Sequence, residues 1–174
     1  MSAANVQVVR MGQIVEYDGD DCNVTIAKNG RRYLNYGGAR FKFVFRSLPA
    51  LYGVAKHSKY DPKLSLIIRD QAVIDAFAEL SNRVKDGFGQ DESKTYKPFL
   101  LGDATTGCVK LVIKIPANAK CVDGSNVQGG IMPDDLCSVV FTTAVYEYGQ
   151  YRGFSHKLES VKVVPASSST LQIL

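Results

Sequence analysis

Apolar and polar residues alternate along most of this chain, and a period of two is typical of β-strands. The clearest example is residues 40–46, in which Phe41, Phe43 and Phe45 share one face, while Arg and Lys recur on the other. We therefore expect a half-buried strand with an apolar inner face and a cationic outer face. On the same grounds, strands are predicted at 6–10, 13–17, 23–27, 31–36, 40–46, 63–69, 109–115, 136–146 and 154–164. The Asn29-Gly30 pair before the fourth of these predicts a hairpin turn.

The period changes to that of a helix in one place, residues 71–85. Asp70 precedes this segment as a plausible N-cap, and Gly87 follows it as a stop signal. The apolar residues that recur at helical spacing form a single stripe: Val73, Ile74, Phe77, Leu80 and Val84. A single stripe predicts a helix that packs on a sheet.

Seven to nine strands and one helix predict a mainly-β fold, for which an OB-like small β-barrel capped by the helix fits best. A jelly-roll sandwich is the alternative, because the number of strands does not separate the two. The length of 174 residues suits one domain, which we place at 1–165. Residues 166–174 are expected to form a flexible tail. Its apolar end, 171–174, is expected to dock onto the domain or onto another subunit, so a homo-oligomer is expected.

Positive charge is concentrated between Lys28 and Arg69. This stretch holds ten Lys or Arg against one acid, Asp61, a net charge of +9, whereas the whole chain carries +4 and the remainder therefore −5. Seven aromatic residues lie in the same stretch. Cations neutralise phosphates and ring faces stack on unpaired bases, so this mixture is typical of a site for single-stranded nucleic acid. A solvated strand face above ordinary core phenylalanines is the alternative interpretation.

The candidate interface residues follow from this charge and aromatic pattern. The expected phosphate contacts are Arg31, Arg32, Arg40, Lys42, Arg46, Lys56, Lys59 and Lys63. The expected stacking residues are tyrosines, because a tyrosine in a loop has less core to fill: Tyr33, Tyr36, Tyr52 and Tyr60. A second aromatic pair, Tyr148 and Tyr151, stands at a predicted hairpin tip beside Arg152.

Other chemistry is not indicated by the sequence. It contains no nucleophile elbow, phosphate-binding glycine loop or metalloprotease motif, so we expect a non-enzymatic protein without a cofactor. The four cysteines are widely spaced, which argues against a zinc site and for reduced thiols in the cytoplasm or nucleus. No apolar run approaches the roughly 18 residues of a membrane span, and the N-terminus does not read as a secretory signal.

Residues 40–164 resemble the OB-fold single-stranded-DNA-binding proteins of bacteriophages and large DNA viruses. The resemblance lies in an F-x-F strand that leads into a proline-containing loop (41–49), a buried strand (64–68), a helix with an apolar stripe, and an aromatic-glycine hairpin with an apolar return strand (146–161). It implies a protein that coats unpaired strands in DNA replication, recombination or repair, with replication proteins as further partners. Many members end in an acidic tail that recruits those proteins, whereas residues 167–174 contain no acid.

Two other functions remain open at this point. The first is a small viral coat protein with a basic face against the genome, although residues 1–27 lack the cationic arm that such proteins often carry. The second is an RNA-binding module, because stacking and phosphate contacts serve DNA and RNA alike.

Overall fold

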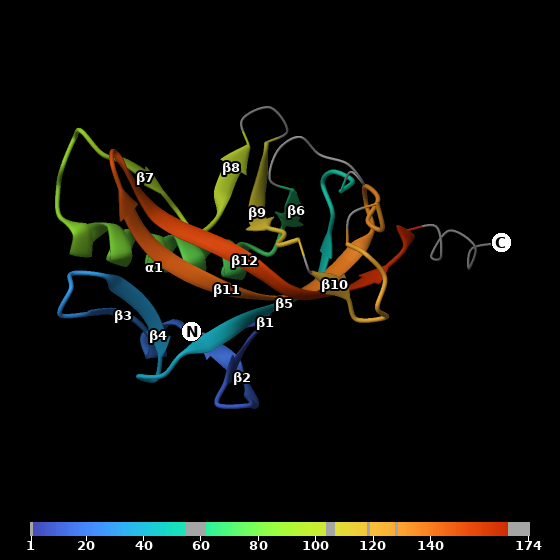
Figure 1. The fold of residues 1–174 in the computed structure, drawn as a ribbon, viewed down its shortest axis with the longest axis horizontal. Coiled ribbons are helices and arrows are strands. Elements are labelled where there is room, and N and C mark those ends of the chain that lie inside the picture. Colours follow the sequence, from blue (N-terminus) through green and yellow to red (C-terminus); the bar gives the residue numbers. More distant parts are fainter. Residues whose placement is uncertain (1, 55–61, 104–106, 118, 128, 167–174) are drawn as a thin grey trace.

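A computed structural model describes residues 2–54, 62–103, 107–117, 119–127 and 129–166 of the chain (Figure 1). The strands are β1 (Ser2–Arg10), β2 (Gln13–Asp18), β3 (Cys22–Ile26), β4 (Arg32–Tyr36), β5 (Phe41–Pro49), β6 (Lys63–Ile68), β7 (Thr95–Lys97), β8 (Leu101–Asp103), β9 (Cys108–Lys114), β10 (Lys120–Cys121), β11 (Leu136–Tyr148) and β12 (Tyr151–Val164). The helices are the short 3-10 helix η1 (Gly19–Asp21) and α1 (Gln71–Phe88). The fold is thus mainly β with one long helix, as the alternation of the sequence predicts.

Five strands form the centre of the fold in the order β5-β11-β12-β9-β6. The end of β5 returns toward β6 through a bridge between Ala50 and Leu66 and through the backbone N–H of Leu51, which donates to the carbonyl oxygen of Ser65. The five strands therefore approach a ring that remains partly open, because one bridge rather than a full ladder joins its last two members. This arrangement confirms the OB-like prediction. A jelly roll would need two facing sheets, whereas the strands paired around this ring belong to one sheet.

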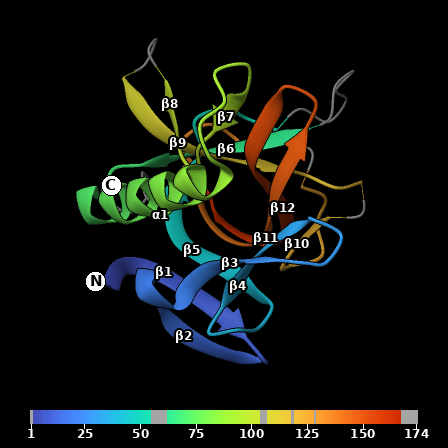
Figure 2. The same cartoon turned by 90° about the vertical axis from the view of Figure 1, so that its left-hand side faces the viewer.

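The helix lies at one end of the ring (Figure 2), and its apolar stripe belongs to the core. Phe77, at the centre of the stripe, is fully buried, and its ring centroid lies 4.4 Å from that of Phe99 and 4.8 Å from that of Tyr17. The side-chain carboxylate of Asp70 accepts a hydrogen bond from the N–H of Ala72, which confirms the predicted N-cap. Aromatic and aliphatic side chains of the inner strand faces, including those of β5 and β11, fill the rest of the core.

The helix ends later than the sequence predicts. It continues to Phe88 and stops at Gly89, whose φ of +82° breaks the helical backbone, so Gly87 is a helical residue and not the stop. The number of strands is also larger than the predicted seven to nine, since twelve lie in the described ranges. The additional ones, β7, β8 and β10, have two or three residues each, too few for alternation to be recognised.

Two hairpins extend beyond the ring. The β3–β4 hairpin forms a separate two-stranded sheet, and the long β11–β12 hairpin projects past the ring on the same side of the molecule as the end of α1 (Figure 1).

Among the described residues, no helix combines the length and the apolarity that a membrane crossing requires. The expected docking segment, 171–174, lies outside the described residues.

Candidate nucleic-acid interface

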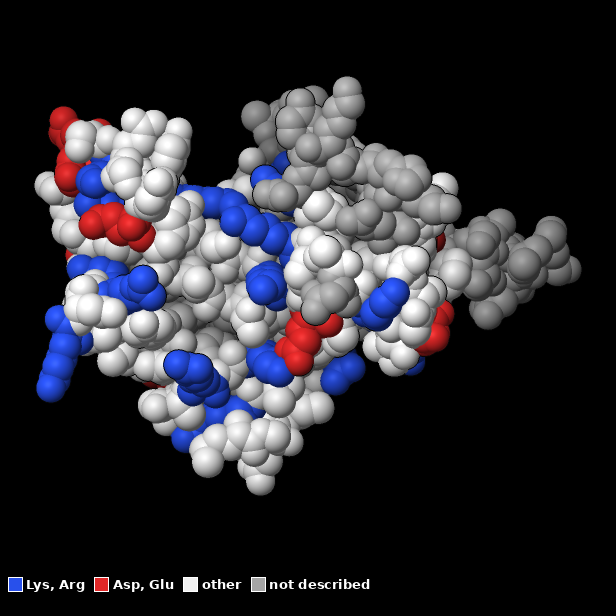
Figure 3. Space-filling view, in the orientation of Figure 1, with Lys and Arg blue, Asp and Glu red and all other residues white. Residues whose placement is uncertain are grey.

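A groove with a volume of about 1120 Å³ is lined by β4, the start of β5, the second half of β11 and the end of α1. Of its described lining residues, four are basic, Arg31, Arg32, Arg40 and Lys42, and one is acidic, Glu147. Figure 3 shows this face of the molecule, with Lys and Arg side chains spread across its middle. The groove therefore presents a cationic wall, and we call it the groove throughout.

The turn between β3 and β4 places two of the predicted residues in the groove. Gly30 adopts a φ of +83°, and the side-chain oxygen of Asn29 accepts a hydrogen bond from the N–H of Arg31. The Asn-Gly pair thus forms the hairpin that the sequence predicts. Arg31 follows the turn directly, and Tyr33 lies on β4 with 43% of its surface exposed. Tyr33 lies on the strand predicted at 31–36 and not in a loop, and this strand still leaves its ring accessible.

The cationic face of β5 and the end of α1 also line the groove. Arg40 precedes β5 and is exposed, while Phe41 is half-buried and lines the groove. The guanidinium of Arg32 lies 4.7 Å from the ring centroid of Phe88, a cation–π distance. The groove therefore brings together five sequence-predicted site residues with aromatic side chains between them: Arg31, Arg32, Tyr33, Arg40 and Lys42.

Two acids lie near these cations, and each is held by an ion pair. The Nζ of Lys42 lies 2.6 Å from the carboxylate of Glu159, with both side chains partly exposed. Glu147 lies 3.0 Å from Nε of Arg152. The three arginines of the groove form no ion pair with any acid among the residues described. Their charge is therefore available to an anionic ligand.

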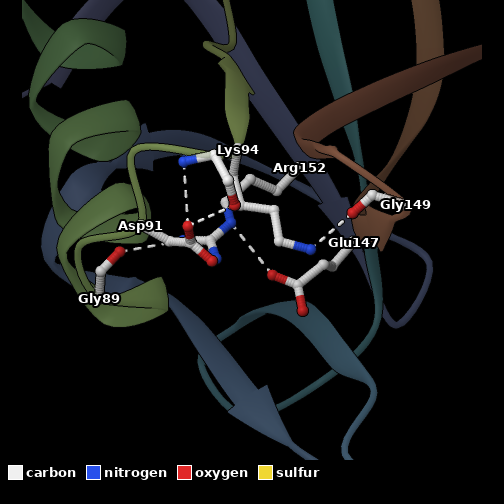
Figure 4. Close-up of polar contacts among 7 residues, drawn as sticks. Gly89, Asp91, Lys94, Glu147, Gly149 and Arg152 are labelled. Atoms are coloured by element: carbon white, nitrogen blue, oxygen red, sulfur yellow. Dashed lines mark hydrogen bonds and ion pairs between the residues drawn. The ribbon is translucent and has the colours of Figure 1, made fainter.

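Arg152 does not lie on the exposed surface, in contrast to its expected role beside the hairpin tip. It is only 7% exposed, because its guanidinium is enclosed by Glu147, by Asp91 at 3.9 Å and by the carbonyl oxygen of Gly89, to which it donates a 2.9 Å hydrogen bond (Figure 4). The same guanidinium lies 5.0 Å from the ring centroid of Phe88. A group with these contacts is not free to bind phosphate, so we correct this assignment.

Tyr36 is also unsuited to the stacking role that the sequence suggests. It closes β4 instead of lying in a loop, and only 5% of it is exposed. Its hydroxyl donates to the carbonyl oxygen of Glu16 and accepts from the N–H of Asp18, and its ring packs against Tyr17 and Phe41. Burial raises the pKa of Tyr36. The ring has no free face for a base, and Tyr36 belongs to the core.

The other predicted residues lie away from the groove. Arg46, farther along β5, donates two hydrogen bonds to the side-chain oxygen of Gln7. Tyr52 is exposed beyond the far end of β5. Tyr148 and Tyr151 are exposed at the tip of the β11–β12 hairpin, Tyr148 at 83%. The remaining candidates in the basic loop, Lys56, Lys59 and Tyr60, lie outside the described residues.

A row of lysines crosses the outer face of the sheet next to the groove. Lys63 on β6 is the registered partner of Lys114 on β9, and Lys114 is the registered partner of Lys157 on β12. All three are exposed, and we call them the lysine row. Lys157 in turn pairs with Thr142 of β11, which lines the groove, so the row begins where the groove ends.

A fourth lysine lies beside the row. Gly153 pairs with Lys97, and a Cβ at Gly153 would collide with the Lys97 backbone, so only glycine allows β7 to approach here. Burial lowers the pKa of Lys97, and the positive charges of Lys63 and Lys114 lower it further. The charge of Lys97 therefore adds to that of the lysine row.

Sequence reasoning included Lys63 but missed Lys97, Lys114 and Lys157 as site residues. Alternation does predict that Lys114 points outward, but the other two lie far from it in the sequence. Only the pairing of β12 with β7 and β9 brings them together, and those pairs are parallel. No turn motif signals a parallel pair, so the signal was absent from the local sequence.

Comparison with known proteins gives structural likeness only. No protein-family model matches the chain, and no curated protein is significantly similar to it in sequence. The single-stranded DNA-binding protein from bacteriophage Enc34 has a TM-score of 0.49 and 13% identity, covering 85% of this chain and 99% of that one. The same protein in complex with single-stranded DNA has a TM-score of 0.48 and 14% identity, with coverage of 82% and 95%.

The single-stranded DNA-binding protein encoded by bacteriophage T7 has a TM-score of 0.45 and 12% identity, covering 70% of this chain and 91% of that one. Each of these neighbours is described as a single-stranded DNA-binding protein of a bacteriophage.

Proposed function

We propose that this protein binds single-stranded DNA in the groove and along the lysine row. The observation that carries the proposal is a groove whose lining includes four basic residues and the accessible ring of Tyr33. The one acid among its described lining residues is already paired with Arg152. Such a surface matches a ligand with regularly spaced negative charges and flat apolar faces. An unpaired nucleic-acid strand is that ligand.

The charge and the rings make different contributions. Neutralising phosphates releases condensed counterions, which supplies sequence-independent affinity that falls as salt rises. Stacking on an aromatic ring contributes about 1–3 kcal/mol per base and needs a base whose face is free. The rings of the groove therefore favour a single strand over a duplex, whose bases are stacked on each other.

The lysine row supports the same function because it costs stability. Like charges directly opposite each other on neighbouring strands destabilise a sheet, and Lys114 faces a lysine on both sides. A polyanion laid across the row would relieve this repulsion. We place the phosphates of the bound strand along it, continuing the path that begins in the groove.

In the cell, the protein would act without catalysis, coating and protecting unpaired strands during replication, recombination or repair. It would do so inside the host cell, as a homo-oligomer, with replication proteins as further partners. Self-association through the apolar end of the chain, 171–174, is part of this proposal, and so is the assignment of residues 1–165 to one domain.

The direct test is fluorescence anisotropy of a labelled poly-dT oligonucleotide titrated with the native protein. We expect saturable binding that unlabelled poly-dT displaces and unlabelled duplex does not. Poly-U RNA as a third competitor reports the preference between DNA and RNA. Displacement by duplex at the same concentration as by poly-dT would contradict the stacking part of the proposal.

A further inference from the structure

Arg152 joins the β11–β12 hairpin to the segment that follows α1. In the strand register Arg152 lies opposite Glu147, next to the terminal Tyr148–Tyr151 pair of the hairpin. Its guanidinium also contacts Asp91 and the carbonyl oxygen of Gly89, which belong to the segment after α1 (Figure 4). Lys94 adds a hydrogen bond from its Nζ to the carbonyl oxygen of Gly149 in the hairpin turn. The buried guanidinium thus has three anionic or carbonyl partners from two parts of the chain.

One of these partners, Glu147, also lines the groove. It is the single acid among the described lining residues, and its side chain remains 47% exposed while its carboxylate contacts Nε of Arg152. Without that contact, the carboxylate would face the cations of the groove wall with no counter-charge of its own. It would then pair with one of them or repel a phosphate, and either outcome removes about one phosphate contact.

We propose that Arg152 is a positioning residue for the groove, which keeps the Glu147 carboxylate from competing with phosphates for the groove's cations. Arg152 itself contacts no DNA. The inference rests on the proposed function, and it gives the buried arginine a role that neither a phosphate contact nor a simple hairpin brace supplies. A brace would require only the contacts to Asp91 and Gly89, whereas the pairing with Glu147 determines the charge of the groove.

The size of the effect follows from the charge that is released. One unit charge about 4 Å from another in water interacts strongly enough to change affinity roughly fivefold. Losing one phosphate contact also makes the slope of log affinity against log salt less negative by about 0.7 for a single strand. Arg152→Gln should therefore bind poly-dT about fivefold more weakly than the native protein, with the shallower slope.

The decisive test is rescue by a second substitution. In Arg152→Gln with Glu147→Gln, no carboxylate is released, so affinity and salt slope should return to within about twofold of native values. Glu147→Gln alone should not weaken binding, and Arg152→Lys, which keeps a positive charge beside Glu147, should bind nearly as tightly as the native protein. Thermal unfolding monitored by circular dichroism confirms that each variant is folded.

The outcomes separate the two proposals. If Arg152→Gln binds poly-dT weakly and adding Glu147→Gln does not restore the affinity, then Arg152 acts only by supporting the hairpin. That result would overturn this inference. If Arg152→Gln does not fold, weak binding by folded Arg152→Lys or by Glu147→Gln would overturn it equally. No binding of poly-dT by the native protein would overturn the proposed function and this inference with it.

Discussion

Replacing Lys114 by glutamine should make the protein more stable and a weaker binder of DNA. Lys114 lies between Lys63 and Lys157 in the strand register, and its charge contributes to the lowered pKa of Lys97. Each like-charged pair directly opposite on a sheet costs roughly 0.2–1 kcal/mol. Removing two such pairs should raise the free energy of unfolding by about 0.5–1.5 kcal/mol, an unusual result because most substitutions destabilise.

The same substitution removes one cation from the proposed DNA path. The slope of log affinity for poly-dT against log salt should become less negative by about 0.7. Urea unfolding gives the stability and anisotropy at several salt concentrations gives the slope. The gain in stability should shrink at about 1 M salt, where the Debye length falls to roughly 3 Å.

Lys162→Gln is the matched control, since this lysine is also exposed on β12 but its registered partner on β11 is Ser138. It should not stabilise the protein. If Lys114→Gln loses stability, or gains no more than the control does, then the row is not under electrostatic strain. Unchanged DNA affinity and slope in Lys114→Gln would place the bound strand elsewhere.

Three further predictions address the groove and the core. Arg40→Ala with Lys42→Ala should weaken binding to all sequences alike and leave stability within about 1 kcal/mol of native, because both side chains are solvent-facing; loss of folding on urea titration would contradict the strand assignment. Tyr33→Ala should lose about 1–3 kcal/mol of binding free energy for poly-dT, measured by anisotropy. Tyr36→Phe should keep native affinity and lose about 1 kcal/mol of folding stability, because its hydroxyl hydrogen bonds are removed. Equal affinities of the two variants for poly-dT would refute stacking on Tyr33. Burial lowers the pKa of His156 to about 4, so between pH 7 and pH 5 the unfolded chain binds a proton that the folded protein excludes. The free energy of unfolding should therefore fall by about 2 kcal/mol between pH 7 and pH 5. A fall of the same size in His156→Asn would show that other groups cause it.

The sequence predicts most of the fold because alternation and turn chemistry are local signals. The strand at 40–46, the Asn29-Gly30 turn and the cap at Asp70 all appear in the structure where the pattern places them. The β7, β8 and β10 strands were missed because two or three residues carry no period. Their positions depend on pairing with β12 and β9, which are distant in the sequence.

The candidate site was predicted less completely, for a related reason. A sequence identifies cations but not their partners, so Arg152 beside the predicted hairpin tip is taken for a DNA contact although Glu147 and Asp91 enclose it. Tyr36 is proposed as a stacking residue although it ends the strand predicted at 31–36, and alternation along that strand turns its side chain inward. The lysine row could be recognised only from the sheet topology, because no local sequence pattern places its members side by side.

The central claim is tested most directly by the affinity of the native protein for labelled poly-dT over a range of salt concentrations. If about five phosphates are neutralised in the groove and along the lysine row, log affinity should fall with log salt at a slope near −3.5. A slope near zero would contradict the account, because it would mean that the cations of the groove and the row do not contact the DNA backbone.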